Sequence, residues 1–323
     1  MRLLCSVVLV PLIAVFACSA WDRTRKYDQA PASEFLFDRQ PPTFECADRS
    51  PGQRDGNSGE VRLRAGNEPP YALTRSEELH LPKSEVPALT ITSDPSGRIA
   101  VNGNERGDWS MRFCSRGEGN SQAEAYQQLQ DISMTHLGSV VSINNLSRSI
   151  NPYTTGSLLL AAPADAPTII HASYAPVEVR DMSGPLRVTA SHARATILDT
   201  TGQVDADAFV VDFAGSQGKV TLTAEAEINL KMMATKFDGT ILASAQRPVR
   251  MLVPVGFLTS VQAMVNRAQD FVCRADLCSK VKAEKTTGLY VFTYTGDGSA
   301  NPERVHLRSE QATVVIDNIG RKN

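Results

Sequence analysis

The sequence predicts an all-β (mainly) protein: a right-handed β-solenoid, or β-helix-like stack, preceded by a small unit of a β-hairpin and a helix. Short runs of alternating apolar and polar residues recur between residues 176 and 243, and many of them begin with a glycine. The glycines at positions 184, 202, 218 and 239 are 18, 16 and 21 residues apart. A repeat of about 20 residues is typical of a coiled sheet in which each turn of the chain covers the next.

Alternation along these runs predicts strands that bury one side. Val204 and Ala206, for example, alternate with Asp205 and Asp207, and period-two alternation places such residues on opposite faces of a strand. Residues 249–254 depart from the alternation and predict a buried strand near the end of the stack. Later strands are expected at 258–265, 289–295, 304–308 and 312–317. We expect the last of these to cap the final edge of the sheet, because an uncovered edge invites aggregation.

Residues 86–145 predict the smaller unit. Residues 89–92 and 99–101 alternate on either side of a turn signal at 94–97, which predicts a hairpin. A third strand is expected at 109–113. Ser121 and Glu124 form a capping box, so a helix is expected over 122–132. Two short strands follow at 133–137 and 139–144, turning at Gly138, and a further strand is expected near 158–162.

The first 20 residues have the pattern of a secretion signal. Arg2 precedes an apolar run that ends at Phe16, and this run is short for a membrane span. Val15-Phe-Ala-Cys18 is similar to a lipobox, in which Cys18 carries a lipid, although Phe16 departs from that motif. Cleavage after Ala20 is the alternative, and an uncleaved membrane anchor is a third. We therefore expect an exported protein of the cell envelope, in the periplasm or as an outer-membrane or cell-surface lipoprotein.

The predicted organisation has five parts. These are a signal peptide at 1–20 (1–17 for a lipoprotein signal), a polar tether at 21–85, the strand–helix–strand unit at 86–145, the β-solenoid at 146–318 and a tail at 319–323. The formal net charge of the 323 residues is −2. Without a basic excess the chain has no electrostatic footprint for nucleic acid, and membrane contact is expected only through an N-terminal lipid.

Four cysteines remain after the signal: Cys46, Cys114, Cys273 and Cys278. An even number in an exported chain indicates disulfides. Proximity favours Cys273–Cys278, which leaves Cys46–Cys114. The spacing of Cys273 and Cys278 also suggests a metal site, but no histidine lies near them and zinc requires four ligands. We expect neither a metal nor a cofactor.

Several segments resemble the bacterial putative-adhesin family, a cell-envelope β-solenoid domain of unknown function. They are Gly97-Arg-Ile-Ala-Val-Asn-Gly103, Gln122-Ala-Glu-Ala, the glycine-opened runs, Arg250-Met-Leu-Val-Pro254 and Gly288-Leu-Tyr-Val. The resemblance covers about residues 86–317 and implies an exported, largely β protein. It implies no catalytic residue, and we expect a non-enzymatic binding or scaffold protein whose partner is an unidentified envelope or surface protein or glycan.

The candidate binding residues are Asp205, Asp207, Glu227 and Asn229, as a polar row on adjacent turns of the stack. Calcium would need six to eight oxygens in one pocket, and nearby basic residues favour ordinary cross-strand ion pairs instead.

The alternative function is a carbohydrate-active enzyme of the parallel β-helix class. Its two carboxylates would be Asp199 with Asp205, or Asp205 with Asp212. A purely structural envelope protein is a third hypothesis. The sequence contains no nucleophile elbow, zinc-protease motif or phosphate loop.

Overall fold

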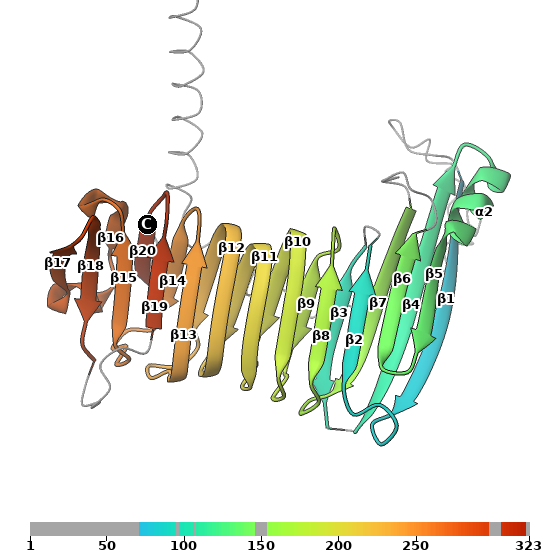
Figure 1. The fold of residues 1–323 in the computed structure, drawn as a ribbon, viewed down its shortest axis with the longest axis horizontal. Helices are drawn as coiled ribbons and strands as arrows, with labels where there is room; N and C mark the ends of the chain where they lie inside the picture. Colours follow the sequence, from blue (N-terminus) through green and yellow to red (C-terminus); the bar gives the residue numbers. More distant parts are fainter. Residues whose placement is uncertain (1–70, 95–96, 106, 146–153, 297–304, 321–323) are drawn as a thin grey trace, which may run out of the picture.

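The computed structural model describes residues 71–94, 97–105, 107–145, 154–296 and 305–320. These residues form a long row of stacked strands in two layers (Figure 1), with one apolar core between the layers. We call the layer that faces the viewer in Figure 1 the front layer and the other the back layer. The prediction of a mainly β fold is confirmed.

The front layer is built from strands that pair in the following order. They are β5 (Ile132–Leu137), β6 (Val140–Asn145), β2 (Leu89–Ser93), β8 (Thr168–Ala172), the first halves of β10 (Leu186–Leu198), β11 (Gln203–Gly215) and β12 (Gln217–Met232), then β13 (Asp238–Ala245), β19 (Val305–Ser309), β15 (Val261–Val265), β18 (Leu289–Tyr294) and β17 (Lys282–Thr286). Pairing is parallel from β6 to β15 and antiparallel at both ends.

The back layer runs alongside it in the same way. Its strands are β1 (Tyr71–Pro82), β4 (Asp108–Gly119), β7 (Thr154–Pro163), β3 (Ile99–Asn104), β9 (Val177–Arg180), the second halves of β10, β11 and β12, then β14 (Val249–Val253), β20 (Val314–Asn318) and β16 (Phe271–Cys273). The chain thus passes repeatedly from front to back. The helix α2 (Gln122–Asp131) covers the β1–β4 end, and the short 3-10 helices are η3 (Ala268–Asp270) and η4 (Asp276–Lys280).

The glycines that open the predicted runs lie on top of one another at a corner of the stack. A β-carbon added to Gly202 would lie 2.4 Å from the carbonyl oxygen of Gly184, and one added to Gly218 would lie 2.7 Å from that of Gly202. Successive turns of the chain are therefore so close here that a side chain does not fit. This packing explains the glycine period that the sequence shows.

Most of the predicted elements are present. The predicted helix is α2, in which Ser121 accepts a hydrogen bond from the backbone N–H of Glu124, as a capping box requires. Gly138 turns between β5 and β6 with a φ of 59°. The buried strand expected at 249–254 is β14, whose five residues are all buried.

Three predictions about strand placement were wrong. β2 and β3 form no hairpin with each other, because β2 pairs with β6 and β8 in the front layer whereas β3 pairs with β7 and β9 in the back layer. β20 does not cap an edge, since it lies between β14 and β16, while β18 and β17 extend the front layer beyond β15. Regular structure begins at Tyr71, inside the predicted tether, because β1 pairs along its whole length with β4.

Candidate interaction surface

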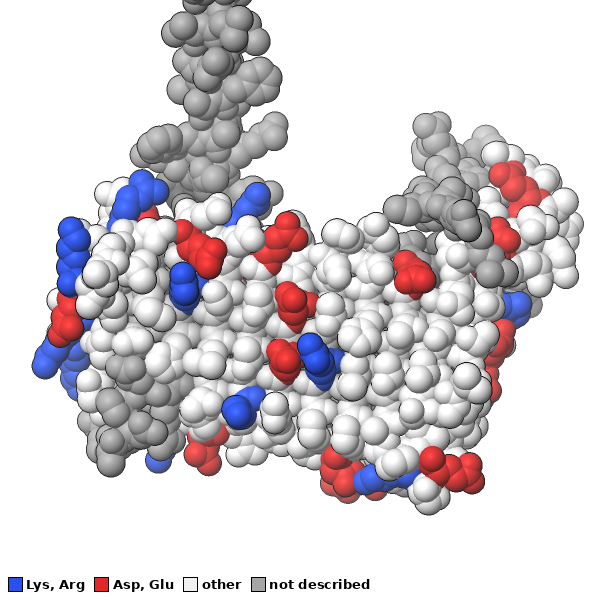
Figure 2. Space-filling model, in the orientation of Figure 1, with Lys and Arg blue, Asp and Glu red and all other residues white. Residues whose placement is uncertain are grey.

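The outward side of the front layer is a long surface of short polar and apolar side chains. Two rows cross the paired strands from β8 to β19. One row is Ile169, Arg187, Asp205, Thr221, Leu242 and His306, and the other is His171, Thr189, Asp207, Thr223, Ser244 and Arg308. Figure 2 shows this side as mostly uncharged, with a few charges of both signs over the middle of the stack. The mixture gives no strong field that would select a highly charged ligand.

Asp205 and Asp207 lie on this surface, as predicted for a polar row. The Oδ2 atom of Asp205 is 3.9 Å from Nε of Arg187, and both side chains are more than half exposed. An exposed pair of this kind is worth about 0–1 kcal/mol. The pair therefore leaves both side chains available to a partner at little cost.

Glu227 and Asn229 lie in the back layer, so the structure does not bring the four predicted residues together. Asn229 is buried, and its Nδ2 atom donates a 2.8 Å hydrogen bond to Oδ1 of Asp212. The Oε1 atom of Glu227 lies 3.6 Å from a guanidinium nitrogen of Arg250. The register between β11 and β12 shifts at the corner after Ala208. Sequence alternation does not reveal such a corner. The part of each strand that follows the corner lies in the other layer.

Aromatic side chains mark the corner at which the chain leaves the front layer. Tyr174, His192 and Phe209 each follow one of the paired alanines Ala172, Ala190 and Ala208 on successive turns. The rings of Tyr174 and His192 are stacked, with centroids 5.1 Å apart. Tyr174 is 42% exposed and Phe209 is 40% exposed. We call these three residues the aromatic corner.

The alternation of apolar and polar residues in the sequence did not reveal the aromatic corner. A signal is present in the repeat: Ala172-Ser-Tyr174 recurs 18 residues later as Ala190-Ser-His192. Buried alanine at the same place in successive turns predicts that the residues after it stack in a column. An exposed apolar group at such a place is a candidate contact for a partner.

Two aspartates occupy a corner at the back layer in the left-handed conformation. Asp181 has a φ of 55° and Asp199 a φ of 52°. Partial burial raises the pKa of the Asp181 carboxyl, and the negative charge of Asp199 on the next turn raises it further. Among the described residues no group of three or more His, Cys, Asp or Glu side chains is placed to hold a metal ion.

Replacing Asp181 by asparagine is expected to stabilise the protein near neutral pH. Because the folded state binds the Asp181 proton more tightly than the unfolded state, wild-type stability falls as the pH rises from the ordinary value of 3.8 through the raised pKa. An asparagine side chain has no proton to lose, and asparagine tolerates the left-handed backbone. Urea unfolding of both proteins from about pH 3 to about pH 7 covers this window. It measures the difference in their free energies of unfolding at each pH.

The control is Asp207→Asn, which removes a carboxylate from the front surface and leaves the Asp181–Asp199 pair intact. The gain from Asp181→Asn should grow across the window. A gain that is the same at every pH, or that Asp207→Asn reproduces, contradicts the assignment to this pair.

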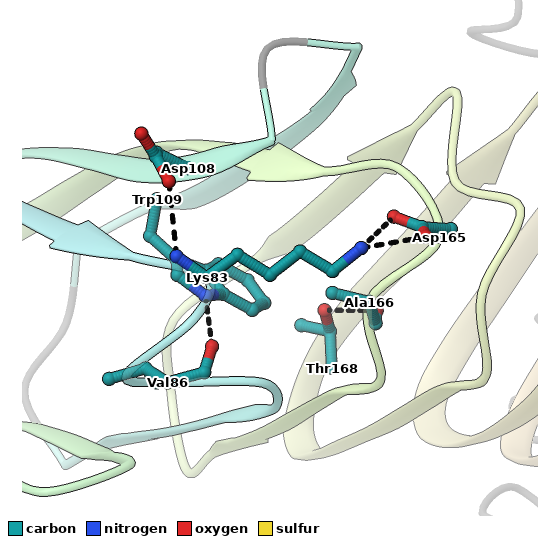
Figure 3. Close-up of polar contacts among 7 residues, drawn as sticks. All are labelled: Lys83, Val86, Asp108, Trp109, Asp165, Ala166 and Thr168. Carbon is teal, nitrogen blue, oxygen red and sulfur yellow. Dashed lines mark hydrogen bonds and ion pairs between the residues drawn. The ribbon is translucent and has the colours of Figure 1, made fainter.

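A separate group of polar contacts fastens β1 to the β7–β8 corner (Figure 3). Lys83 Nζ lies 2.7 Å from both carboxylate oxygens of Asp165, and its backbone N–H donates to Asp108 at 3.1 Å. The hydrogen bond from Lys83 lowers the pKa of Asp165. Below them the Nε1–H of the buried Trp109 donates a 2.7 Å hydrogen bond to the carbonyl of Val86. These contacts connect the end of β1 to the β7–β8 corner and to the start of β4.

Cys273 and Cys278 form a disulfide, as predicted. Cys114 is also disulfide-bonded, and its partner lies outside the described residues. Cys18 and Cys46 lie outside them too, so the lipid on Cys18 and the pair Cys46–Cys114 stay predictions. Within the described ranges no helix is both long and apolar enough to cross a membrane.

The fold is similar to solved structures that bear the adhesin name. One is a putative cell adhesion protein from Clostridium sporogenes, with a TM-score of 0.30, 10% identity, and coverage of 76% of this chain and 99% of that one. Putative adhesins from Bacteroides fragilis (TM-score 0.24, 10% identity, 79% and 100% coverage) and Parabacteroides merdae (0.28, 8%, 76% and 96%) also match. No protein-family model and no curated protein matches the sequence. The solved structures thus carry the name of the family that the sequence resembles.

Proposed function

We propose that this chain is an exported, non-enzymatic binding protein of adhesin-like type. In this proposal the stacked turns form a right-handed β-solenoid, and its front layer and aromatic corner contact a protein or glycan of the cell surface. The observation that carries the proposal is the aromatic corner, where half-exposed rings from neighbouring turns lie beside a long, weakly charged surface.

The exposed side chains of the front layer and the aromatic corner supply the contacts for a partner. Aromatic rings give a large apolar contact area with few rotatable bonds, so they lose little entropy when a partner binds. The threonine hydroxyls of the front rows can donate and accept hydrogen bonds to an extended ligand. A stack of turns repeats this chemistry along its length, which suits an extended partner.

Export follows from the signal-like pattern of the first 20 residues and fits the disulfides at Cys114 and Cys273–Cys278. We propose the cell envelope as the location. A lipid on Cys18 would tether the protein there, and Cys18→Ser would then release it from the membrane fraction.

The carbohydrate-active enzyme finds less support in the geometry. Asp205 belongs to the front layer and Asp212 to the back layer, where it is buried and pairs with Arg194. Asp199 lies at a corner. Two carboxylates that act on one glycosidic bond must flank it from the same groove, and the pairs considered from the sequence are not placed in this way.

Binding to immobilised cell-surface proteins and to a glycan array tests the proposal, with residues 21–323 as the probe. We expect saturable binding that Tyr174→Ala with Phe209→Ala weakens at least about tenfold, since truncating central aromatic contacts costs about 2 kcal/mol or more. Val255→Ala is the matched control, because Val255 is also exposed and apolar but lies beyond β14. Equal losses in both variants, or no saturable binding by folded protein, would contradict the proposal.

A further inference from the structure

The two ends of the stack leave part of the apolar core uncovered. We call one the β1 end, formed by β1, α2 and β5, and the other the β17 end, formed by β16, η4, β17 and β18 (Figure 1). The apolar residues that pack against the core but stay partly exposed all lie at these ends. They are Leu79 and Met134 at the β1 end, and Phe271, Cys273, Cys278, Val281, Tyr290 and Phe292 at the β17 end. Apolar groups left open in this way are candidate contacts for a partner.

Each end also has an open strand edge in both layers. Among the strands that the structure describes, β5 and β17 each pair with one neighbour in the front layer, and β1 and β16 each pair with one in the back layer. All five residues of β17 are exposed. An edge strand presents a row of backbone N–H and C=O groups with which another strand can pair.

The exposed edge of the β17 end is basic. Residues 280–286 hold three lysines against one glutamate, which leaves two positive charges; they are Lys280, Lys282, Lys285 and Glu284. Asp276 in η4 is also acidic, but its carboxylate accepts hydrogen bonds from the backbone N–H of Gly256 and from the side chain of Asn318. The left end of the molecule in Figure 2 accordingly shows mainly basic side chains.

The β1 end is acidic. β1 and α2 hold four acidic residues, namely Glu77, Glu78, Glu124 and Asp131. Arg75 lies 2.9 Å from Glu77, and Arg112 of β4 lies 2.8 Å from Glu78. With these two arginines counted, two negative charges remain. The right end of the molecule in Figure 2 shows mainly acidic side chains.

Lys285 restricts which partner can cover the β17 end. It pairs with Tyr290, and Tyr290 pairs with the buried Val265, so Lys285 lies on the core side of β17. Its Nζ atom is 5.4 Å from the centre of the Tyr290 ring. An inward-pointing charge on an edge strand discourages unselective pairing. A partner that covers this end must therefore bring negative charge as well as apolar groups.

We infer that copies of this chain assemble end to end, with the β17 end of one copy against the β1 end of the next. β17 then lies beside β5 of the next copy and extends the front layer. The contact covers apolar residues of both ends and brings the lysines of residues 280–286 to the acidic residues of β1 and α2. A second copy supplies both properties that the β17 end requires, since its β1 end is apolar and acidic.

The directions of the strands suit this contact. The front layer is parallel from β6 to β15, and two antiparallel steps through β18 give β17 the direction of β6. β5 runs opposite to β6. When one copy follows another along the same axis, β17 and β5 therefore meet as an antiparallel pair of five and six residues.

Opposite charge also determines which ends meet. Two β17 ends repel each other, as do two β1 ends, so a contact between like ends is disfavoured. A contact between two different surfaces is heterologous and need not close after two copies. Because the two surfaces lie at opposite ends of the row in Figure 1, the assembly is an open row of copies.

Sedimentation velocity of residues 21–323 at rising protein concentration tests the inference. At an ionic strength of about 0.01 M we expect the mean mass to rise beyond that of two copies. Association should weaken several-fold at about 1 M, because the Debye length falls from about 30 Å to about 3 Å. Protein that stays monomeric at every concentration, or that stops at two copies, would overturn the inference.

Two charge reversals test which ends meet. Lys282→Glu with Lys285→Glu makes both ends acidic, and Glu78→Lys with Asp131→Lys makes both ends basic, so each variant alone should be monomeric. An equal mixture of the two variants should associate again, since every end then finds an oppositely charged end on the other variant. The matched control, Lys219→Glu with Lys236→Glu, makes the same change in charge away from both ends and should associate like the unmodified chain.

A mixture that stays monomeric, or a control that loses association, contradicts the assignment to these ends. If a variant fails to fold by circular dichroism, carbodiimide cross-linking of isotope-labelled with unlabelled unmodified chain gives a second measurement. Cross-links between copies from Lys282 or Lys285 to Glu124 or Asp131 support the inference, and cross-links between copies confined to other carboxylates contradict it. These measurements contain no other partner, so their outcome does not depend on whether the front layer binds one.

Discussion

Gly239→Ala is expected to destabilise the protein by about 3 kcal/mol or more, because two separate penalties meet at this residue. Its φ of 139° is a backbone conformation that side chains rarely adopt. A β-carbon added there would lie 2.0 Å from the carbonyl oxygen of Gly218 on the preceding turn. The oxygen belongs to the backbone and the β-carbon is fixed directly to it, so the clash can be relieved only by moving one turn of the backbone away from the next.

Gly256→Ala separates these two penalties. Gly256 has a φ of 76°, but a β-carbon added there meets nothing within 4 Å, so only the conformational cost of about 1–2 kcal/mol remains. Urea unfolding of both variants gives the two free energies. A loss at Gly239 no greater than that at Gly256 would show that the turns of the stack can separate easily, contrary to the close packing of the glycine corner.

The glycine period revealed the stack because it has a local cause that every turn repeats. The same holds for the helix, where Ser121 and Glu124 are three residues apart and determine its start without help from the rest of the chain. Residues 94–97 show the limit of such signals. Turn-forming residues are expected both between two paired strands and between strands of different layers, so only the tertiary structure shows that β2 and β3 lie in different layers.

The position of the last turn could not be read from the sequence for a related reason. β19 and β20 come last in the chain but lie between β13–β14 and β15–β16. Alternation specifies which side of a strand is buried, and it says nothing about which neighbour the strand pairs with. The prediction of one polar row failed for the same reason. Asp207 and Glu227 follow the same alternation but lie in opposite layers.

Phe213→Ala is expected to cost about 3–5 kcal/mol, the usual range for a large buried side chain. Phe213 lies in the second half of β11, in the middle of the stack, and is fully buried. Its ring packs where Gly215 has no side chain, since a β-carbon added to Gly215 would lie 2.9 Å from the ring. Neither neighbouring turn can fill the space, because each is held in register by its own parallel pairing to β11.

Phe209→Ala is the matched control, because Phe209 lies on the same strand and is 40% exposed at the aromatic corner. Its loss should be below about 1 kcal/mol, in line with surface substitutions. Urea unfolding followed by both circular dichroism and tyrosine fluorescence measures each variant. Because each turn contacts only its neighbours, weakening a central turn should also separate the two transitions in Phe213→Ala. Equal losses in the two variants would contradict the assignment of Phe213 to the core and of Phe209 to the surface, and with it the use of Phe209→Ala as a probe of binding alone.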